Sequence, residues 1–165
     1  MTDCPKAGYF PRRKHLRRLD RVAISGPPVF FLTVCVYRRH HVLAEPSIAG
    51  ILIEGWRHAK AQHGWLVGRY VVMPDHVHFF ASPLGEGAKE LSRLLNYWKR
   101  STAIRIRRAG VSEFRWQREF FDHLLRSDES YAGEWDYVRD NPVRANLVGR
   151  PEEWPYQGEV NALGV

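Results

Sequence analysis

The apolar positions of the chain follow two periods, separated by glycine and proline. Short runs rich in β-branched and aromatic residues are typical of buried strands, and apolar residues spaced three or four apart are typical of amphipathic helices. The last helix should end near Asn141, because Pro142 disfavours helix in the residue before it. The sequence therefore predicts strands at 29–37, 65–73 and 76–82, helices at 47–63 and 90–108, a short strand within 114–125, and a helix from 128 or 130 to about 141.

The order of these elements indicates the fold class. Strands and helices alternate without a strict βαβ repeat, which favours an α+β fold in which an antiparallel-rich sheet has helices packed on it. The 165 residues are the length of one domain. We expect a basic N-terminal arm at 1–22, the folded domain at 23–150 and a C-terminal tail at 151–165.

The chain is basic, and its cations are clustered. There are 25 Lys and Arg against 18 Asp and Glu, a formal net charge of +7, and the sequence pI is near 9.7. This balance favours a nucleic-acid partner, although it can also serve solubility alone. The candidate phosphate contacts are Arg12, Arg13, Lys14, Arg17 and Arg18 in the arm, and Lys99 and Arg100 on the helix at 90–108. The arm could equally be a solvated tail.

Composition also excludes several classes of protein. Cys4 and Cys35 can form at most one bridge, and neither lies in a CxxC pair, which excludes a disulfide scaffold or a cysteine zinc site. No apolar run approaches the ~18 residues that span a bilayer, and the N-terminus has no apolar signal core. We therefore expect a soluble, cytoplasmic protein with no membrane partner.

The sharpest local feature is the pair His76 and His78, inside a predicted strand. Side chains alternate along a strand, so both imidazoles project from one face together with Phe80, while Val77 and Phe79 face the other way. Two adjacent imidazoles can bind a divalent cation, which then needs at least one more ligand. A surface pair or a hydrogen-bonded core pair would show the same spacing, and the residues alone leave both readings open.

The last predicted helix offers a nucleophile. Tyr131, Trp135 and Val138 form its apolar stripe, and Tyr137 flanks that stripe with Asn141 on the same side, four residues on. A phenol and an amide on one helix face could approach a metal site. Tyr137 could instead pack at the edge of the core, and Asn141 could simply cap the helix.

Three segments together carry a family resemblance: PDHVH at 74–78, WQREFFDHLLR at 116–126 and EWDYVRDNPVRANLV at 134–148. In this order and spacing they resemble the REP-associated tyrosine transposases, relatives of the single-tyrosine HUH transposases of the insertion-sequence-200/605 family. The resemblance covers roughly residues 15 to 157. It implies a ferredoxin-like HUH fold for the domain at 23–150.

The resemblance also implies the active-site residues. His76 and His78 correspond to the metal ligands, Tyr137 to the nucleophile, and Asn141 to a further metal contact at a position where insertion-sequence relatives carry glutamine. The implied metal is Mg²⁺ or Mn²⁺. His123 lies in the family's Asp-His segment and is left out of the ligand set.

Two other residues are considered by composition alone. Tyr97 is a rival nucleophile on the basic helix, but it matches no catalytic position of the family. Asp75 is assigned to turn chemistry after Pro74.

The implied activity is cleavage and rejoining of single-stranded DNA at hairpins of repetitive extragenic palindromes, through a 5′-phosphotyrosine at Tyr137. Two alternatives remain: a catalytically silent DNA- or RNA-binding protein on the same fold, and a metal-dependent nuclease that activates water. The expected location is the cytoplasm, at the nucleoid, and the protein could act as a monomer or a homodimer.

Overall fold

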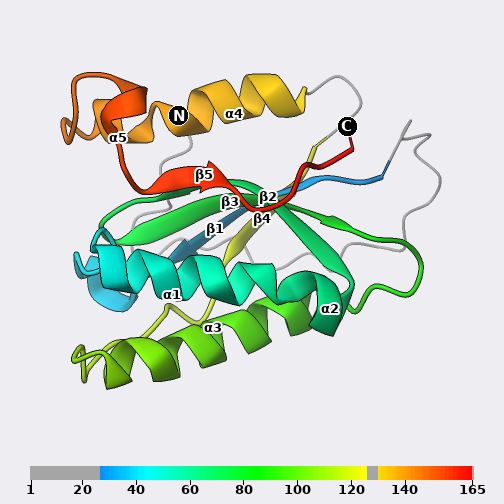
Figure 1. Ribbon diagram of the computed structural model, residues 1–165, viewed down its shortest axis with the longest axis horizontal. Coiled ribbons are helices and arrows are strands. Elements are labelled where there is room, and N and C mark those ends of the chain that lie inside the picture. The colour runs from blue at the N-terminus through cyan, green and yellow to red at the C-terminus, as the bar shows by residue number, and fades with distance from the viewer. Residues whose placement is uncertain (1–26, 126–129, 165) are drawn as a thin grey trace.

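The structure is a computed structural model that describes residues 27–125 and 130–164. A five-stranded antiparallel sheet forms its centre. Its strand order is β4-β1-β3-β2-β5 (Figure 1). The strands are β1 (Phe30–Cys35), β2 (Trp65–Val72), β3 (His76–Pro83), β4 (Phe121–Leu124) and β5 (Gln157–Glu159). The helices are α1 (Pro46–Arg57), α2 (Ala59–His63), α3 (Leu91–Arg108), α4 (Tyr131–Arg139) and α5 (Asn141–Arg144), with 3-10 turns η1 (Tyr37–Arg39) and η2 (Pro151–Glu153).

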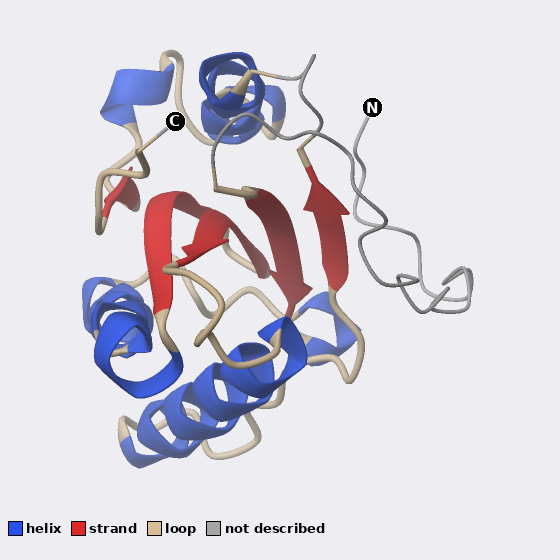
Figure 2. Cartoon of the chain, turned by 90° about the vertical axis from the view of Figure 1, so that its right-hand side faces the viewer, coloured by secondary structure: helices blue, strands red, loops and turns tan. Residues whose placement is uncertain are grey.

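Helices cover both faces of this sheet. Helices α1, α2 and α3 lie on one face and α4 and α5 on the other (Figures 1 and 2). On the first face the Trp56 and Trp98 rings stack 5.2 Å apart, against Phe79 of the central strand. On the second face Phe31 and Phe80 pack together with Val138 of α4. The α+β expectation, an antiparallel sheet with packed helices, is confirmed.

Strand β3 separates the two cores by the alternation predicted for it. Val77 and Phe79 belong to the core under α1 and α3, and Phe80 belongs to the core under α4. His78 shares the face of Phe80 and stacks on Phe31 at 5.4 Å between ring centroids. The histidine pair therefore lies on the face of the sheet that α4 and α5 cover.

Two of the predicted helices are interrupted. The helix expected at 47–63 breaks at His58, whose N–H donates to the carbonyl of Trp56, and Gly64 ends α2 with a left-handed φ of 72°. The last helix ends at Arg139, but Pro142 then lies in the first turn of α5, where its missing N–H costs nothing. Proline ends one helix here and begins another.

The segment 151–165, expected as a tail, is built into the domain as far as it is described. Strand β5 pairs with β2, and the Trp154 indole donates to the carbonyl of Val72 at 3.0 Å. Trp154 and Leu163 are buried in the core under α4. Apolar burial of this kind stabilises by about 1.5–3 kcal/mol per large side chain, which explains why the segment joins the sheet.

The predicted arm at 1–22, with Arg12, Arg13, Lys14, Arg17 and Arg18, lies outside the described residues. Within the residues that the structure does describe, no helix has the length and apolar character needed to cross a membrane.

Candidate metal and nucleophile site

His76 and His78 turn the same ring nitrogen toward each other. Their Nε2 atoms lie 3.1 Å apart, and the two rings are nearly perpendicular. This geometry follows from the two-residue repeat of β3, which projects both side chains from one face. The prediction that the two imidazoles share a face is confirmed.

The outer nitrogen of His76 is held by Asp75. His76 Nδ1 donates to Asp75 Oδ1 at 2.6 Å, and Arg39 Nε forms an ion pair with Asp75 Oδ2 at 2.6 Å. Burial raises the pKa of Asp75, but the hydrogen bond from His76 and the charges of His76, Arg39 and His41 outweigh it, so the pKa is lowered overall. The assignment of Asp75 to turn chemistry was incomplete, because its carboxylate orients His76.

The outer nitrogen of His78 is held by Thr33, its register partner on β1. A hydrogen bond of 2.8 Å joins Thr33 Oγ1 and His78 Nδ1, and the two residues are only 4% and 3% exposed. Burial holds the pKa of His78 well below the usual value for histidine, and the charges of His76, Arg39 and Arg144 lower it further. His78 is therefore neutral at physiological pH, which is the form that can bind a metal.

This arrangement fits a divalent cation. Ligands at about 2.1 Å from an octahedral cation and at right angles are about 3.0 Å apart, close to the 3.1 Å between the two Nε2 atoms. Each outer nitrogen has an oxygen partner, as metal-bound histidines usually do. Within the described residues no three His, Cys, Asp or Glu side chains form a metal cluster. Any further ligands would be an amide, water or substrate oxygens.

The same contacts also permit a pair without a cation. His76 Nε2 is an acceptor because Nδ1 donates to Asp75, so a hydrogen on His78 Nε2 could satisfy the 3.1 Å contact. The Thr33 hydroxyl would then donate to His78 Nδ1, and it would accept from it once a cation occupies Nε2. Thr33 can serve both states because a hydroxyl is both donor and acceptor.

Tyr137 lies on α4, above the face of the sheet that bears the histidines, and is 37% exposed. Arg144 of α5 connects it with them. The Arg144 guanidinium lies 4.1 Å from the centre of the Tyr137 ring and donates to the Tyr137 carbonyl at 2.8 Å. The same charge lowers the pKa of His78. Arg144 is thus within electrostatic reach of both the phenol and the histidine pair.

Asn141 is held within the turn between α4 and α5. Its Nδ2 donates to the carbonyl of Val138 at 2.8 Å, and its Oδ1 accepts from Arg144 at 2.9 Å. Both ends of the amide therefore have protein partners. To ligate a metal through Oδ1, Asn141 would have to exchange or share the contact with Arg144.

Lys99 and Arg100 have different environments on α3. Lys99 Nζ donates to the carbonyls of Gln117 and Arg118 at 2.5 and 2.8 Å, and burial lowers its pKa. Its ammonium is therefore used to hold the loop at 117–118. Arg100 is exposed. Tyr97, the rival nucleophile, packs against His63 with the two rings tilted, and it lies on α3, across the sheet from the histidine pair (Figure 2).

Sequence reasoning missed Thr33, Arg39 and Arg144. Arg144 could have been predicted, because it follows Asn141 by three residues and Tyr137 by seven, which is the spacing of one helical face. Thr33 and Arg39 depend on strand register and on the path of a turn, for which the sequence contains no local signal.

Comparison with known proteins gives the family. The model of the family described as "Transposase IS200 like" matches residues 30–133, more than half of the chain. The match includes both histidines and ends before Tyr137.

Two curated relatives come from Haemophilus influenzae. One, provisionally named a REP-associated tyrosine transposase, is 28% identical over 99 residues, 52% of this chain and 53% of its own length. The chain thus matches about half the length of that relative. The other, an uncharacterized protein, is 24% identical over 172 residues, 87% of this chain and 94% of its own length.

Two solved structures share the fold. One is a REP-associated tyrosine transposase bound to a REP hairpin, with a TM-score of 0.65 and 22% identity, over 87% of this chain and 93% of that chain. The other is a protein from Deinococcus radiodurans assigned as a transposase, with a TM-score of 0.51 and 20% identity, over 68% of this chain and 88% of that one.

Fold, site and family agree. IS200-like transposases are in general metal-dependent, and the 3.1 Å between the two Nε2 atoms is compatible with a shared cation. The resemblance drawn from the motifs at 74–78, 116–126 and 134–148 is confirmed. This chain belongs to the family of IS200-like transposases, enzymes that act on DNA.

Proposed function

We propose that this protein cuts and rejoins single-stranded DNA beside hairpins of repetitive extragenic palindromes, through a 5′-phosphotyrosine at Tyr137. The observation that carries the proposal is the pair of Nε2 atoms 3.1 Å apart, each on a ring whose other nitrogen has an oxygen partner. His76 and His78 would hold Mg²⁺ or Mn²⁺, with Asn141 as a further contact. That cation would polarise the scissile phosphate and orient it for in-line attack.

The chemical step is a transesterification. The Tyr137 oxygen attacks the phosphorus, a new P–O bond forms to the phenol, and the bond to the 3′ oxygen breaks. The phenol loses its proton to solvent or a nearby base, and the leaving oxygen takes one up to become a 3′-hydroxyl. Because the phosphotyrosine retains a phosphoester bond, another 3′-hydroxyl can reverse the step and join strands without ATP.

The surrounding side chains support this chemistry. Asp75 fixes the ring of His76, and Thr33 fixes the ring of His78. Arg144, beside the Tyr137 ring, would stabilise negative charge that develops on the transferred phosphate.

Binding would use phosphate contacts from Arg100 and from the N-terminal arm, with hairpin shape and unpaired bases supplying selectivity. The structural relative bound to a REP hairpin supports this choice of substrate. Lys99 contributes by holding the loop at 117–118. A protein of this kind would act in the cytoplasm, at the nucleoid, as a monomer or a homodimer.

The two alternatives differ from this proposal in their product. A catalytically silent binding protein leaves the DNA intact, and a nuclease that activates water releases fragments without attached protein. Only attack by tyrosine leaves protein covalently bound to the 5′ end of the downstream fragment.

The test is covalent capture of single-stranded hairpin oligonucleotides made from the repetitive palindromes of the host genome. The label is placed at the 3′ end, because a 5′-phosphotyrosine retains the 3′ fragment. We expect a labelled protein band in denaturing gels, dependent on Mn²⁺ or Mg²⁺. Tyr137→Phe should abolish it and leave affinity nearly intact. Tyr97→Phe, an exposed tyrosine across the sheet, is the matched control and should retain it.

Two results would reject the mechanism. Full cleavage by Tyr137→Phe would remove that residue from the reaction. Unchanged Mn²⁺-dependent cleavage by His76→Ala would remove the histidine pair from it. Binding of the hairpin with no adduct from the unmodified protein would leave the binding-only alternative.

A further inference from the structure

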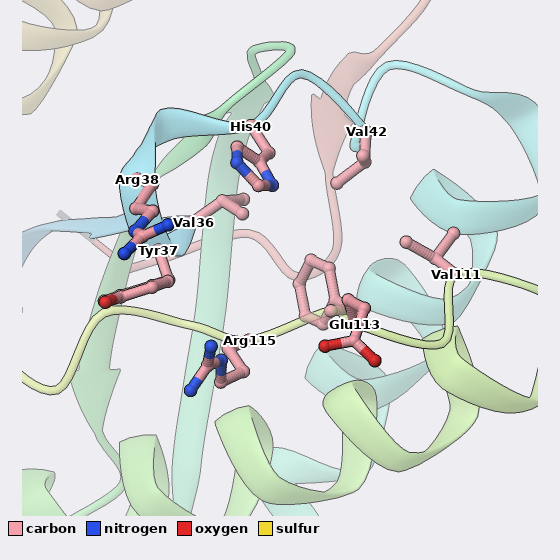
Figure 3. Close-up of a pocket in the computed structure, with 9 residues that line it drawn as sticks. Val36, Tyr37, Arg38, His40, Val42, Val111, Glu113 and Arg115 are labelled. Atoms are coloured by element: carbon pink, nitrogen blue, oxygen red, sulfur yellow. The ribbon is translucent and has the colours of Figure 1, made fainter.

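A pocket of about 250 Å³ lies at the end of β1, between the turn η1 and the segment 111–115. It is formed by the chain that follows β1 and by the segment before β4, and it is lined by Tyr37, Arg38, His40, Glu113, Phe114 and Arg115, among others (Figure 3). Ligand pockets for drug-sized molecules run from about 300 Å³ upward. This one is therefore suited to a single small group rather than to a folded hairpin.

The pocket adjoins the candidate active site through Arg39. Tyr37, Arg38 and His40 line the pocket, whereas Arg39, between them in sequence, forms the ion pair with Asp75 that supports His76. The turn η1 therefore contributes side chains both to the pocket and to the support of His76.

Both walls of the pocket are fixed by backbone hydrogen bonds. Val36 N–H donates to the carbonyl of Asp75 at 2.8 Å, and Tyr37 N–H donates to the carbonyl of Arg115 at 2.9 Å. Arg38 and Arg39 adopt left-handed backbone conformations, with φ of 56° and 59°. Non-glycine residues in this region are strained and persist where the surroundings enforce them, often at functional sites. The pocket is thus formed before any ligand binds.

One side of the pocket has the chemistry of a base-stacking site. Tyr37 is 38% exposed, and the guanidinium groups of Arg115 and Arg38 lie 4.6 and 5.3 Å from its ring centre. Figure 3 shows the three side chains gathered together. In the described part of the chain neither arginine forms an ion pair with a carboxylate. An exposed aromatic ring beside two arginines that form no ion pair within the described residues suits a nucleotide, whose base stacks and whose phosphates are anionic.

The other side of the pocket presents a carboxylate. Glu113 lies toward Val111, away from Arg38 (Figure 3), and within the described residues it too forms no ion pair. A carboxylate repels phosphate but accepts two parallel hydrogen bonds from neighbouring N–H groups. Guanine presents such a pair, from N1 and the exocyclic N2. Adenine and cytosine present one amino group beside an acceptor, and thymine presents one N–H between two carbonyls.

We propose that this pocket binds one unpaired guanine of the DNA substrate. Tyr37 stacks on the base, Arg38 and Arg115 contact the adjoining phosphates, and Glu113 selects guanine through its N1–H and N2–H groups. The proposal rests on the proposed function for the role of this nucleotide in cleavage, but the pocket's base preference is a property of binding alone.

The test is equilibrium binding of fluorescent pentanucleotides by anisotropy. The probes are pentathymidine and its versions with guanine, adenine or cytosine at the centre, which form no hairpin. The protein is the full chain carrying Tyr137→Phe, so that no covalent product forms. We expect the guanine probe to bind about tenfold more tightly than the other three, the usual discrimination of a bidentate base contact.

Matched variants assign the preference to the pocket. Glu113→Gln has one acceptor and one donor in place of two acceptors, so it should lose the guanine preference. Its amide instead matches the amino group and neighbouring acceptor of adenine or cytosine. Glu86→Gln, the same change at an exposed residue outside the pocket, should keep the guanine preference. Tyr37→Ala should weaken all four probes by about tenfold through loss of stacking, and Tyr37→Phe should restore them.

Equal binding of the four probes by the protein with Glu113 intact would overturn the proposal, as would a guanine preference that survives Glu113→Gln. Covalent capture on hairpin DNA is scored separately. An adduct without guanine preference rejects only the pocket, and a guanine preference without an adduct rejects only the tyrosine mechanism.

Discussion

Replacing Thr33 with valine tests whether the hydrogen bond on the outer nitrogen of His78 serves a metal site. Valine has nearly the same shape as threonine, so Thr33→Val removes the 2.8 Å contact between Oγ1 and Nδ1 and changes little else. His78 would still stack on Phe31, but it would have no acceptor for the hydrogen that Nδ1 must carry when Nε2 binds a cation.

The expected magnitudes follow from burial. Both residues are at most 4% exposed, so water does not replace the lost partner, and an unsatisfied buried polar group costs about 1–3 kcal/mol of folding free energy. Loss of an outer partner of a metal-bound histidine typically weakens metal binding by about 10- to 100-fold. We expect the Mn²⁺ concentration for half-maximal cleavage to rise by that factor.

A second buried threonine separates metal binding from stability. Thr102 is fully buried on α3, donates to the carbonyl of Trp98 at 2.7 Å and accepts from the Trp116 indole at 3.0 Å. Urea unfolding should show comparable destabilisation for Thr102→Val and Thr33→Val, whereas Mn²⁺ titration of adduct formation should shift for Thr33→Val alone. An unshifted titration for Thr33→Val, with stability reduced, would refute the role assigned to this hydrogen bond.

Two further predictions concern α3 and α2. Arg100→Ala should reduce the slope of log hairpin affinity against log salt concentration by about one phosphate contact. Lys99→Met should lower Tm and leave that slope unchanged. The opposite result would make Lys99 the phosphate contact. His63 is buried with no hydrogen-bond partner on either ring nitrogen in the described chain, and burial, then the charge of Lys89, lowers its pKa. The unfolded chain then protonates His63 more readily than the folded protein does. The free energy of unfolding, measured in urea, should therefore fall as pH drops below about 6.5. His63→Phe should show a smaller fall, and an equal fall would assign it to other groups.

The sequence predicted those parts of the fold that depend on local periodicity. The strands at 65–73 and 76–82 and the helix at 90–108 correspond closely to β2, β3 and α3, because their apolar spacing, glycines and prolines act within a few residues. It did not predict β5, since a three-residue strand has no period of its own. That strand forms because Trp154 and Leu163 bury apolar surface against a core made elsewhere.

The candidate site was also predicted only where it depends on local sequence. The shared face of His76 and His78 follows from the pleat of one strand and was predicted. The partners of their outer nitrogens were not, because Thr33 reaches His78 only through the pairing of β1 with β3. The Asp75 carboxylate is adjacent to His76 in sequence, but its ion pair with Arg39 depends on the path of η1. Spacing along the chain therefore indicates which side chains belong to the proposed site, and tertiary pairing decides which tautomer and orientation the two imidazoles adopt.

The position of Tyr137 relative to the sheet depends in part on residues outside the three segments that carry the family resemblance. At the start of α4, Tyr131 accepts a hydrogen bond from the backbone N–H of Arg69 at 3.0 Å, and a Cβ on Gly68 would lie 2.7 Å from the Tyr131 hydroxyl oxygen. Glycine is thus required in β2 for α4 to approach the sheet this closely. At the other end of α4, Arg144 contacts the Tyr137 ring. The position of Tyr137, the proposed nucleophile, is therefore set by packing at both ends of its helix.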